Sequence, residues 1–300
     1  MTRDLTIAAA QYPVDRLPDF TAFEMKIRAW VGEAAGQGAD VLVFPEYAGL
    51  ELSGLFDDDT AFDLTGSVTA IQPLLPLADD LHAELAREHR VVIVSGSRPQ
   101  MTEDGIVNRA AVFSPSGRAS HQDKRMLIRF EDEEWGIASG GPLRVFDTGS
   151  VRFGISICYD SEFPLIARAQ AEAGAEVILI PSVTEALSGF HRVRIGAQAR
   201  ALENQCVTVQ APLVGAAPWS NAIDISRGRA GIFGPPDIGF PETGVIAEGE
   251  MDIPQWVIAT VDLDAVGRAR SDGAVLNHRL WPKQADGELP LPPVEVVDLT

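Results

Sequence analysis

Two segments of this chain have nearly the same sequence. Residues 38–45 read GADVLVFP, and residues 174–181 read GAEVILIP. In each segment, consecutive apolar residues stand between an acidic residue and a proline, a pattern typical of a short buried strand. One such match could arise by chance, but a second pair follows in the same order, VFSPSG at 112–117 and IFGPPD at 232–237. Together the two matches predict a chain built from two similar halves.

Short apolar runs rich in Val and Ile predict further strands along the chain. These runs lie at 41–44, 91–94, 151–158, 177–180, 206–209 and 257–261. Residues 20–35 and 77–90 have the periodicity of amphipathic helices, and the alternation predicts an α/β fold with helices packed on sheet. Because each half would bury its sheet against the other, we expect one domain over residues 1–280, with two face-to-face sheets and helices outside. Residues 281–300 contain four prolines and little periodicity, so we expect an extended C-terminal arm.

The composition excludes several classes of partner. The 300 residues include 43 acidic and 24 basic ones and carry a formal net charge of −19, which disfavours nucleic acid and anionic membranes. No apolar run approaches the roughly 20 residues of a membrane-spanning helix, and the N-terminus lacks the apolar segment of a secretion signal. The only cysteines are Cys158 and Cys206, too few for a disulfide framework at this length. These features predict a soluble protein of the cytoplasm.

Two residues at strand ends are candidates for chemistry. Glu46 directly follows the strand that ends at Pro45, at the position where α/β sheets usually bind ligands, although an ordinary loop acid would look the same. Cys158 ends the strand 151–157 and precedes a helix expected to begin at Pro164. On such a strand-to-helix turn a thiol can project, while free N–H groups at the helix start can stabilise an anion. The alternative, a small buried core residue, is our expectation for Cys206.

A third candidate is a lysine in a chain that has few. Lys124 is one of three lysines, and its compact ammonium differs from the arginine guanidinium that supplies most positive charge here. An exposed lysine of no special role is the alternative. The acidic stretch that follows, residues 130–137, is expected to be a solvated loop. No phosphate-binding glycine loop occurs and the five histidines are scattered, so we expect neither a cofactor nor a metal site.

Taken together, three segments resemble the motifs of the nitrilase superfamily of carbon-nitrogen hydrolases. They are FPEY at 44–47, DK at 123–124 with FE at 130–131, and ICYDSEFP at 157–164. The similarity extends from residues 8–11, like the family's first strand, to residues 256–259, like its last. It implies a four-layer αββα sandwich with two pseudo-symmetric halves, and assembly as a homodimer or larger homo-oligomer.

The resemblance also implies a role for each motif residue. Cys158 would be the nucleophile, Glu46 the general base and then general acid, and Lys124 the cation that stabilises the tetrahedral oxyanion. The backbone N–H of Tyr159 would be the second oxyanion donor. The family has another glutamate a few residues before a glycine. Aligning that glycine with Gly140 selects Glu133, which we favour, whereas Gly141 would select Glu134.

The triplet at 158–160, Cys-Tyr-Asp, is similar to the amidase and carbamoyl-amidase branches, whereas nitrilases usually have Cys-Trp-Glu. The resemblance therefore implies hydrolysis of a small linear amide, an ω-amide or an N-carbamoyl compound, through a thioester that releases ammonia or an amine. Acyl transfer to an amine, nitrile hydrolysis and a catalytically silent binding protein are the alternatives.

Residues 182–192 are the second half's counterpart of the Glu46 region, so they should overlook the same pocket. Within this segment Glu185, Phe190 and Arg192 are expected to contact substrate. Arg192 could hold a substrate carboxylate in a bidentate pair, whereas Glu185 could hold a cationic group. These two contacts imply opposite substrate charges, and the sequence leaves both open. An arginine flanking a helix is expected here as readily as a ligand contact.

Overall fold

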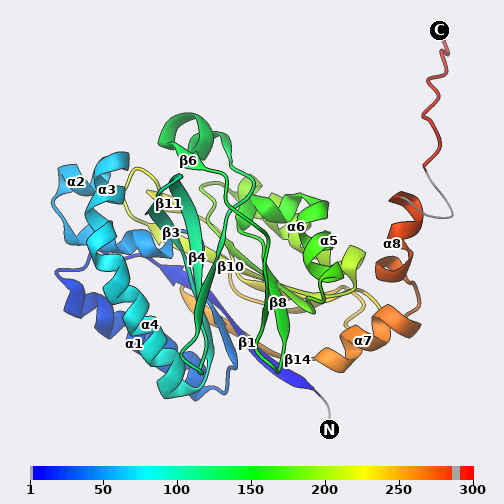
Figure 1. Ribbon diagram of the computed structural model, residues 1–300, viewed down its shortest axis with the longest axis horizontal. Helices are drawn as coiled ribbons and strands as arrows, with labels where there is room; N and C mark the ends of the chain where they lie inside the picture. The colour runs from blue at the N-terminus through cyan, green and yellow to red at the C-terminus, as the bar shows by residue number, and fades with distance from the viewer. Residues whose placement is uncertain (1–2, 286–290) are drawn as a thin grey trace.

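The computed structural model describes residues 3–285 and 291–300 (Figure 1). The first half contains β1 (Asp4–Pro13), α1 (Phe20–Gly36), β2 (Val41–Val43), η1 (Ala48–Leu55), α2 (Asp58–Phe62), α3 (Leu64–Ile71), η2 (Gln72–Leu74), α4 (Leu75–His89), β3 (Val92–Thr102), β4 (Gly105–Phe113), β5 (Ala119–Asp123), η3 (Phe130–Trp135) and β6 (Ile137–Ala138). The second half contains β7 (Val145–Asp147), β8 (Arg152–Ile155), η4 (Cys158–Glu162), α5 (Pro164–Glu172), β9 (Val177–Ser182), α6 (Leu187–Asn204), β10 (Val207–Ala216), β11 (Ile225–Ser226), β12 (Gly231–Phe233), β13 (Val245–Glu248), β14 (Gln255–Asp262), α7 (Leu263–Asp272) and α8 (Asn277–Ala285). The expected α/β class is confirmed.

The strands form a curled mixed sheet whose pairing order repeats. In the first half β1 pairs with β14 and β2, and the order continues through β3, β4 and β5. In the second half β8 pairs with β7 and β9, and the order continues through β10, β12 and β13. The two matched segments of the sequence, β2 and β9, therefore occupy the same place in each series. A short parallel pairing of β1 with β10 joins the two series.

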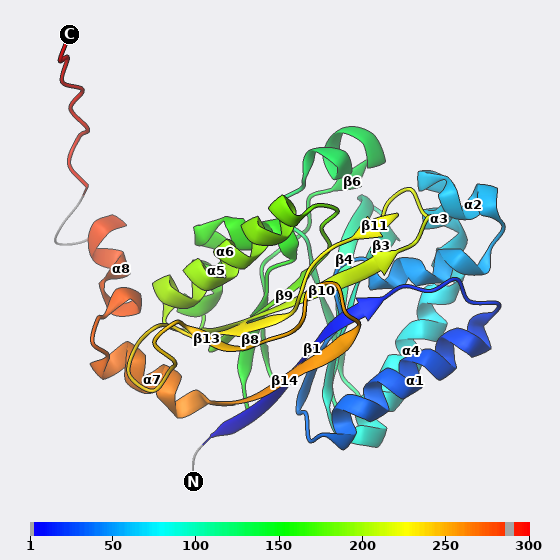
Figure 2. The same ribbon diagram turned by 180° about the vertical axis from the view of Figure 1, so that it is seen from behind.

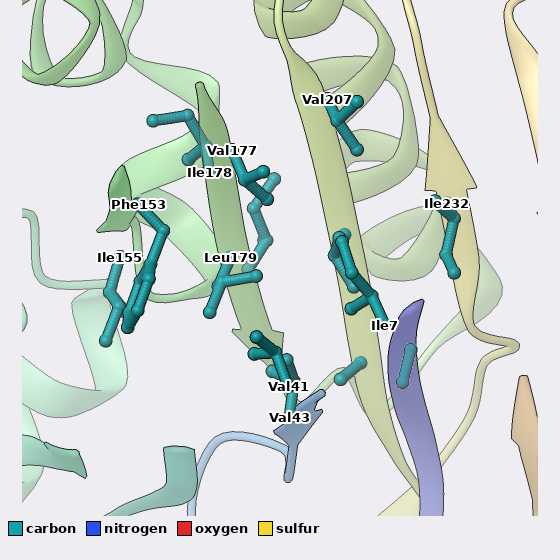
Figure 3. Close-up of a cluster of buried hydrophobic side chains, with 14 of the residues drawn as sticks. Ile7, Val41, Val43, Phe153, Ile155, Val177, Ile178, Leu179, Val207 and Ile232 are labelled. Carbon is teal, nitrogen blue, oxygen red and sulfur yellow. The ribbon is translucent and has the colours of Figure 1, made fainter. Parts of the chain in front are cut away.

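Strands of both series bury side chains in one apolar cluster (Figure 3). Ile7 and Val41 from the first series lie in this cluster with Phe153, Ile155 and Leu179 from the second. Successive side chains of a strand point to opposite faces, so the intervening residues of β1 and β2 face the other way. There they pack against α1 and α4, whereas α5 and α6 cover the strands of the second series (Figures 1 and 2). The sheet strands are thus buried between two sets of helices.

The C-terminal segment differs from its prediction. Residues 281–285, expected to begin an extended arm, belong to α8, which lies near α6 (Figure 2). Pro282 has no N–H to donate to the carbonyl of His278 one turn earlier, and Arg168 Nη1 of α5 donates to that carbonyl instead, at 3.1 Å. The Arg168 guanidinium also lies 5.5 Å from the Trp281 ring centroid. These contacts hold a helix that proline would otherwise disfavour.

Of the remaining part of the predicted arm, residues 291–300 have no regular secondary structure and are exposed, and residues 286–290 lie outside the described residues. Within 3–285 and 291–300, no helix has the length and apolar character needed to span a lipid bilayer.

Candidate active site

Glu46, Lys124 and Cys158 lie together at one cavity, although their positions in the chain are far apart. Glu46 comes shortly after β2, Lys124 directly follows β5, and Cys158 is the first residue of η4, just beyond β8. The cavity has a volume of about 570 Å³, and all three side chains line it. Each side chain is almost fully buried, with 1%, 1% and 6% of its residue surface exposed. The fold therefore brings the three predicted residues to one site.

The backbone at Cys158 is strained in the way the strand-to-helix turn predicts. Its φ of 49° lies in the left-handed region that residues other than glycine rarely adopt. The hydroxyl of Ser161 donates to the Cys158 carbonyl at 2.6 Å, and the thiol donates to the Val183 carbonyl at 3.5 Å. Strain of this kind persists only where the surroundings fix the backbone, and it presents the thiol at the floor of the cavity.

The carboxylate of Asp160 ties the cysteine turn to the lysine loop. Its oxygens accept the backbone N–H groups of Ile157 at 3.1 Å, Arg125 at 3.1 Å and Met126 at 2.7 Å. Burial raises the pKa of Asp160 to about 7, against the lowering effect of these three N–H donors. One side chain thus fixes the residue before the nucleophile and the two residues after Lys124.

Lys124 sits between two carboxylates. Its Nζ lies 2.8 Å from Glu46 Oε1 and 2.6 Å from Glu131 Oε2, and all three side chains are buried. Burial lowers the pKa of Lys124, but the charges of Glu46 and Glu131 outweigh that effect and raise it above the usual range. The lysine is therefore a permanent ammonium.

The second glutamate of this cluster is Glu131, which corrects the expected Glu133. Glu133 is exposed and forms a surface ion pair with Arg129 at 2.8 Å, whereas Glu134 lies exposed on the wall of the cavity. Residues 130–135, expected to be a solvated loop, form the π-helical turn η3, which buries Glu131 completely. The alignment on Gly140 selected Glu133, but it could not show which glutamate of this acidic stretch the turn buries. The Phe-Glu pair within the quoted motif was the signal that pointed to Glu131.

Two further residues of the cluster escaped the sequence analysis. Tyr47 donates its hydroxyl to Glu131 Oε1 at 2.6 Å. Asn108 donates its side-chain amide to Glu46 Oε1 at 2.9 Å and to Glu131 Oε1 at 3.1 Å. Both are buried, and Asn108 is a fully buried polar residue within the mostly apolar strand β4. A buried amide in a strand needs a partner, which is the signal that could have identified it.

The electrostatics of the site make Glu46 a stronger base and the thiol a weaker acid. Burial raises the pKa of Glu46, and the opposing charge of Lys124 lowers it less. Burial and the charge of Glu46 likewise raise the pKa of Cys158 well above its usual value, although Lys124 opposes them. The thiol therefore holds its proton at neutral pH, next to a carboxylate able to remove it.

Two of the three residues expected to contact substrate line the cavity, and the third does not. Glu185 and Arg192 line the cavity, but Phe190 is fully buried and does not, which corrects that prediction. The sequence predicts a helix from Val193 to Glu203, but α6 begins at Leu187. Phe190 therefore belongs to the buried face of this helix. Arg192 lies 3.4 Å from the carboxylate of Glu162, another residue of the cavity wall.

Comparison with known proteins identifies the family of this chain. A model of the carbon-nitrogen hydrolase family matches residues 6–271, a range that includes every residue of the buried cluster. The chain belongs to the carbon-nitrogen hydrolase family. This family membership confirms the resemblance seen in the three sequence motifs.

Among curated proteins, this carbon-nitrogen hydrolase is 35% identical over 272 residues to the Bacillus subtilis protein named "Probable hydrolase YhcX", covering 90% of this chain and 52% of that protein. It is 28% identical over 184 residues to an omega-amidase of Danio rerio, covering 58% of this chain and 62% of the relative. The chain thus spans about half the length of the first and less than two thirds of the second.

Solved structures show the same fold. A carbon-nitrogen hydrolase from Helicobacter pylori G27 aligns with a TM-score of 0.75 at 15% identity, covering 96% of both chains. An amidase from Nesterenkonia sp. AN1, described with acrylamide added to its active site cysteine, aligns with a TM-score of 0.65 at 20% identity. That alignment covers 92% of this chain and 99% of the amidase.

Proposed function

We propose that this protein hydrolyses the carbon-nitrogen bond of a small linear amide, an ω-amide or an N-carbamoyl compound, through a thioester on Cys158. The observation that carries the proposal is the burial of a thiol, a carboxylate of raised pKa and an ammonium together at one cavity. The names of an omega-amidase relative and an amidase structural neighbour support the same chemistry.

In the first step Glu46 removes the thiol proton while the Cys158 sulfur attacks the amide carbon. The raised pKa of Glu46 favours this transfer, which the raised pKa of the thiol makes necessary. The carbonyl oxygen becomes an oxyanion stabilised by Lys124 and by the backbone N–H of Tyr159, which lies in the first turn of η4, where N–H groups lack helical partners. Losing one oxyanion donor of this kind typically costs about 3 kcal/mol.

In the second step the carbon-nitrogen bond breaks and the protonated Glu46 gives its proton to the departing nitrogen. Ammonia or an amine leaves, and the acyl group remains on sulfur. A water molecule then transfers a proton to Glu46 and attacks the thioester carbonyl. When the carbon-sulfur bond breaks, Glu46 returns that proton to the sulfur, and the free acid leaves. While Glu46 is protonated, the charge of Glu131 still raises the pKa of Lys124 and favours its ammonium form.

The charges of the cavity wall favour a neutral or cationic group at the far end of the substrate. Its carboxylates, besides Glu46 and Glu131, are Glu134, Glu162, Glu185 and Asp224. The arginine that could receive a substrate carboxylate, Arg192, already lies beside Glu162. An anionic substrate would therefore meet an acidic wall with its one arginine already paired. Among ω-amides and N-carbamoyl compounds, we therefore favour those whose far end carries no free carboxylate. We propose that Glu185, exposed on this wall, attracts the far end of the substrate.

A panel of amides of equal length, ending in a methyl, a carboxylate or an ammonium group, tests the activity and the charge preference together. Ammonia release should be greatest for the ammonium member and least for the carboxylate member. Cys158→Ala should remove turnover, whereas Cys206→Ala, at a fully buried position in the core outside the cavity, should retain it. Full turnover by Cys158→Ala would reject the proposal. Added amine that diverts product away from the free acid would indicate acyl transfer instead.

We further propose that the two strand series form the four-layer αββα sandwich of the family, as a single domain that includes α8, and that the chain assembles as a homodimer. The apolar cluster shared by both series and the helices on either side support the first point. Light scattering across a dilution series tests the second: a monomer at every concentration would contradict it.

A further inference from the structure

Asn108 forms hydrogen bonds with all three charged residues of the buried cluster. Its side-chain amide donates to Glu46 Oε1 at 2.9 Å and to Glu131 Oε1 at 3.1 Å. Its backbone carbonyl accepts the N–H of Lys124 at 2.9 Å. The residue is completely buried, and it belongs to β4, a strand in the interior of the pairing order. One neutral residue therefore binds both carboxylates and the backbone of the lysine between them.

The Asn108 side chain acts through its NH₂ group, which donates both hydrogen bonds. Only the NH₂ end of an amide can face two carboxylates, so the hydrogen-bond network fixes its orientation. Among the described residues its Oδ1 has no hydrogen-bond partner. Two buried carboxylates and one ammonium leave an excess negative charge, and the amide supplies N–H groups to both carboxylates without adding a charge. Tyr47 gives its hydroxyl to Glu131, whereas the Asn108 amide binds both acids, as the Lys124 ammonium does.

These contacts also orient Glu46. Its Oε1 accepts from both Lys124 and Asn108, while its Oε2 accepts the Val183 N–H, at 3.1 Å. Val183 is also the residue whose carbonyl accepts the Cys158 thiol. The carboxylate is thereby held with Oε1 toward the ammonium and Oε2 on the side of the nucleophile. A base needs this fixed geometry because small displacements of the reacting groups cost large factors in rate.

We propose that Asn108 is a positioning residue for the general base: its amide holds Glu46 oriented and ionised, with Oε2 toward the thiol, and links it to Glu131. This inference rests on the proposed function. Without the amide, Glu46 could rotate about its terminal bond. The excess negative charge would then favour binding of a proton by Glu46. The titratable groups that face Glu46 are Lys124 from the loop after β5, Glu131 from η3, Tyr47 just before η1, and Cys158 from η4.

The test uses Asn108→Leu, similar in volume but without donors, and Asn108→Asp, nearly isosteric but an acceptor. Because a hydrogen bond to the charged form lowers a carboxyl pKa, its loss should raise that of Glu46. The acid limb of the pH profile of kcat/KM should then move to higher pH, by about one unit for Asn108→Leu and further for Asn108→Asp. At the optimum, kcat should fall by about 100-fold, with KM changed much less.

Asn204→Leu is the matched control, because Asn204 is also fully buried but lies in α6 and bonds to the Arg200 carbonyl. It should lower the thermal stability without moving the acid limb. Circular dichroism checks folding, and Asn108→Asp keeps the test possible if Asn108→Leu does not fold. An unchanged acid limb and kcat in both folded Asn108 variants would overturn the inference. Cys158→Ala separates the two claims: if it retains full turnover, the proposed function fails first.

Discussion

The two matched segments of the chain contribute different chemistry to the same site. In the first half, GADVLVFP continues into Glu46 and Tyr47, whose side chains enter the buried cluster. In the second half, GAEVILIP continues into Ser182 and Val183, and Val183 acts through its backbone, binding Glu46 with its N–H and the Cys158 thiol with its carbonyl. The fold repeats, but the function does not.

The difference teaches how an asymmetric site arises in a repeated fold. The first half supplies the charged groups of the cluster, Glu46, Lys124 and Glu131, with the amide of Asn108. The second half supplies the nucleophile Cys158. It also supplies the Val183 carbonyl, which accepts the thiol, and the Ser161 hydroxyl, which binds the Cys158 carbonyl. The two halves are joined at the site, because Asp160 of the second half binds the backbone N–H groups that follow Lys124, and Val183 of the second half binds Glu46.

The largest effect should follow removal of the base from the first half. Glu46→Gln keeps the shape of the side chain but cannot accept the thiol proton. We expect kcat to fall by between about 10²-fold and 10⁴-fold, the usual contribution of a general base. Ammonia release measured across pH checks this. Near wild-type kcat in Glu46→Gln would show that another group removes the proton.

Two glutamates of η3 provide the next comparison. Glu131→Gln removes a charge in contact with Lys124. It should lower kcat by about 100-fold, because the ammonium loses one of the two carboxylates that hold it in position. Glu133→Gln removes only a surface carboxylate paired with Arg129 and should leave kcat unchanged. Steady-state kinetics on both variants decides between them. A loss of activity in Glu133→Gln with none in Glu131→Gln would restore the alignment based on the glycine.

Asp160→Asn tests whether the cysteine turn and the lysine loop need their shared carboxylate. The asparagine can still accept, but it places an NH₂ group against backbone N–H donors. We expect about a tenfold lower kcat from looser positioning and about 1–3 kcal/mol less stability from unsatisfied buried groups. Chemical denaturation and kinetics measure the two effects. Stability lost without any change in kcat would limit Asp160 to folding.

The smallest effect should come from the cavity wall of the second half. Glu185→Gln removes one exposed carboxylate and should raise KM for the ammonium-bearing amide by about twofold to fivefold, the range of an exposed ion pair. KM for the methyl-ended amide should not change, and added salt should reduce the difference. An equal change for both amides would mean that Glu185 acts by shape and not by charge.

The sequence predicted several strands and two of the site residues, because these features follow from patterns among neighbouring residues. The repeated segments indicated β2 and β9, and strand-end positions identified Glu46 and Cys158 before any family was considered. Glu131 was passed over because the alignment relied on a glycine, and the sequence does not show which glutamate of residues 130–135 is buried. Phe190 was misplaced because α6 begins without a side-chain cap, so no residue marked its start. Asn108 was missed because its partners are 23 and 62 residues away in the chain.

The acyl-enzyme itself tests the central claim most directly. The protein is mixed with the preferred amide, quenched in acid within one turnover and digested, and the mass of each cysteine-containing peptide is measured. We predict an added acyl group on the peptide that contains Cys158, and none on the peptide that contains Cys206. Turnover that proceeds with no adduct on Cys158, and that survives in Cys158→Ala, would contradict the account.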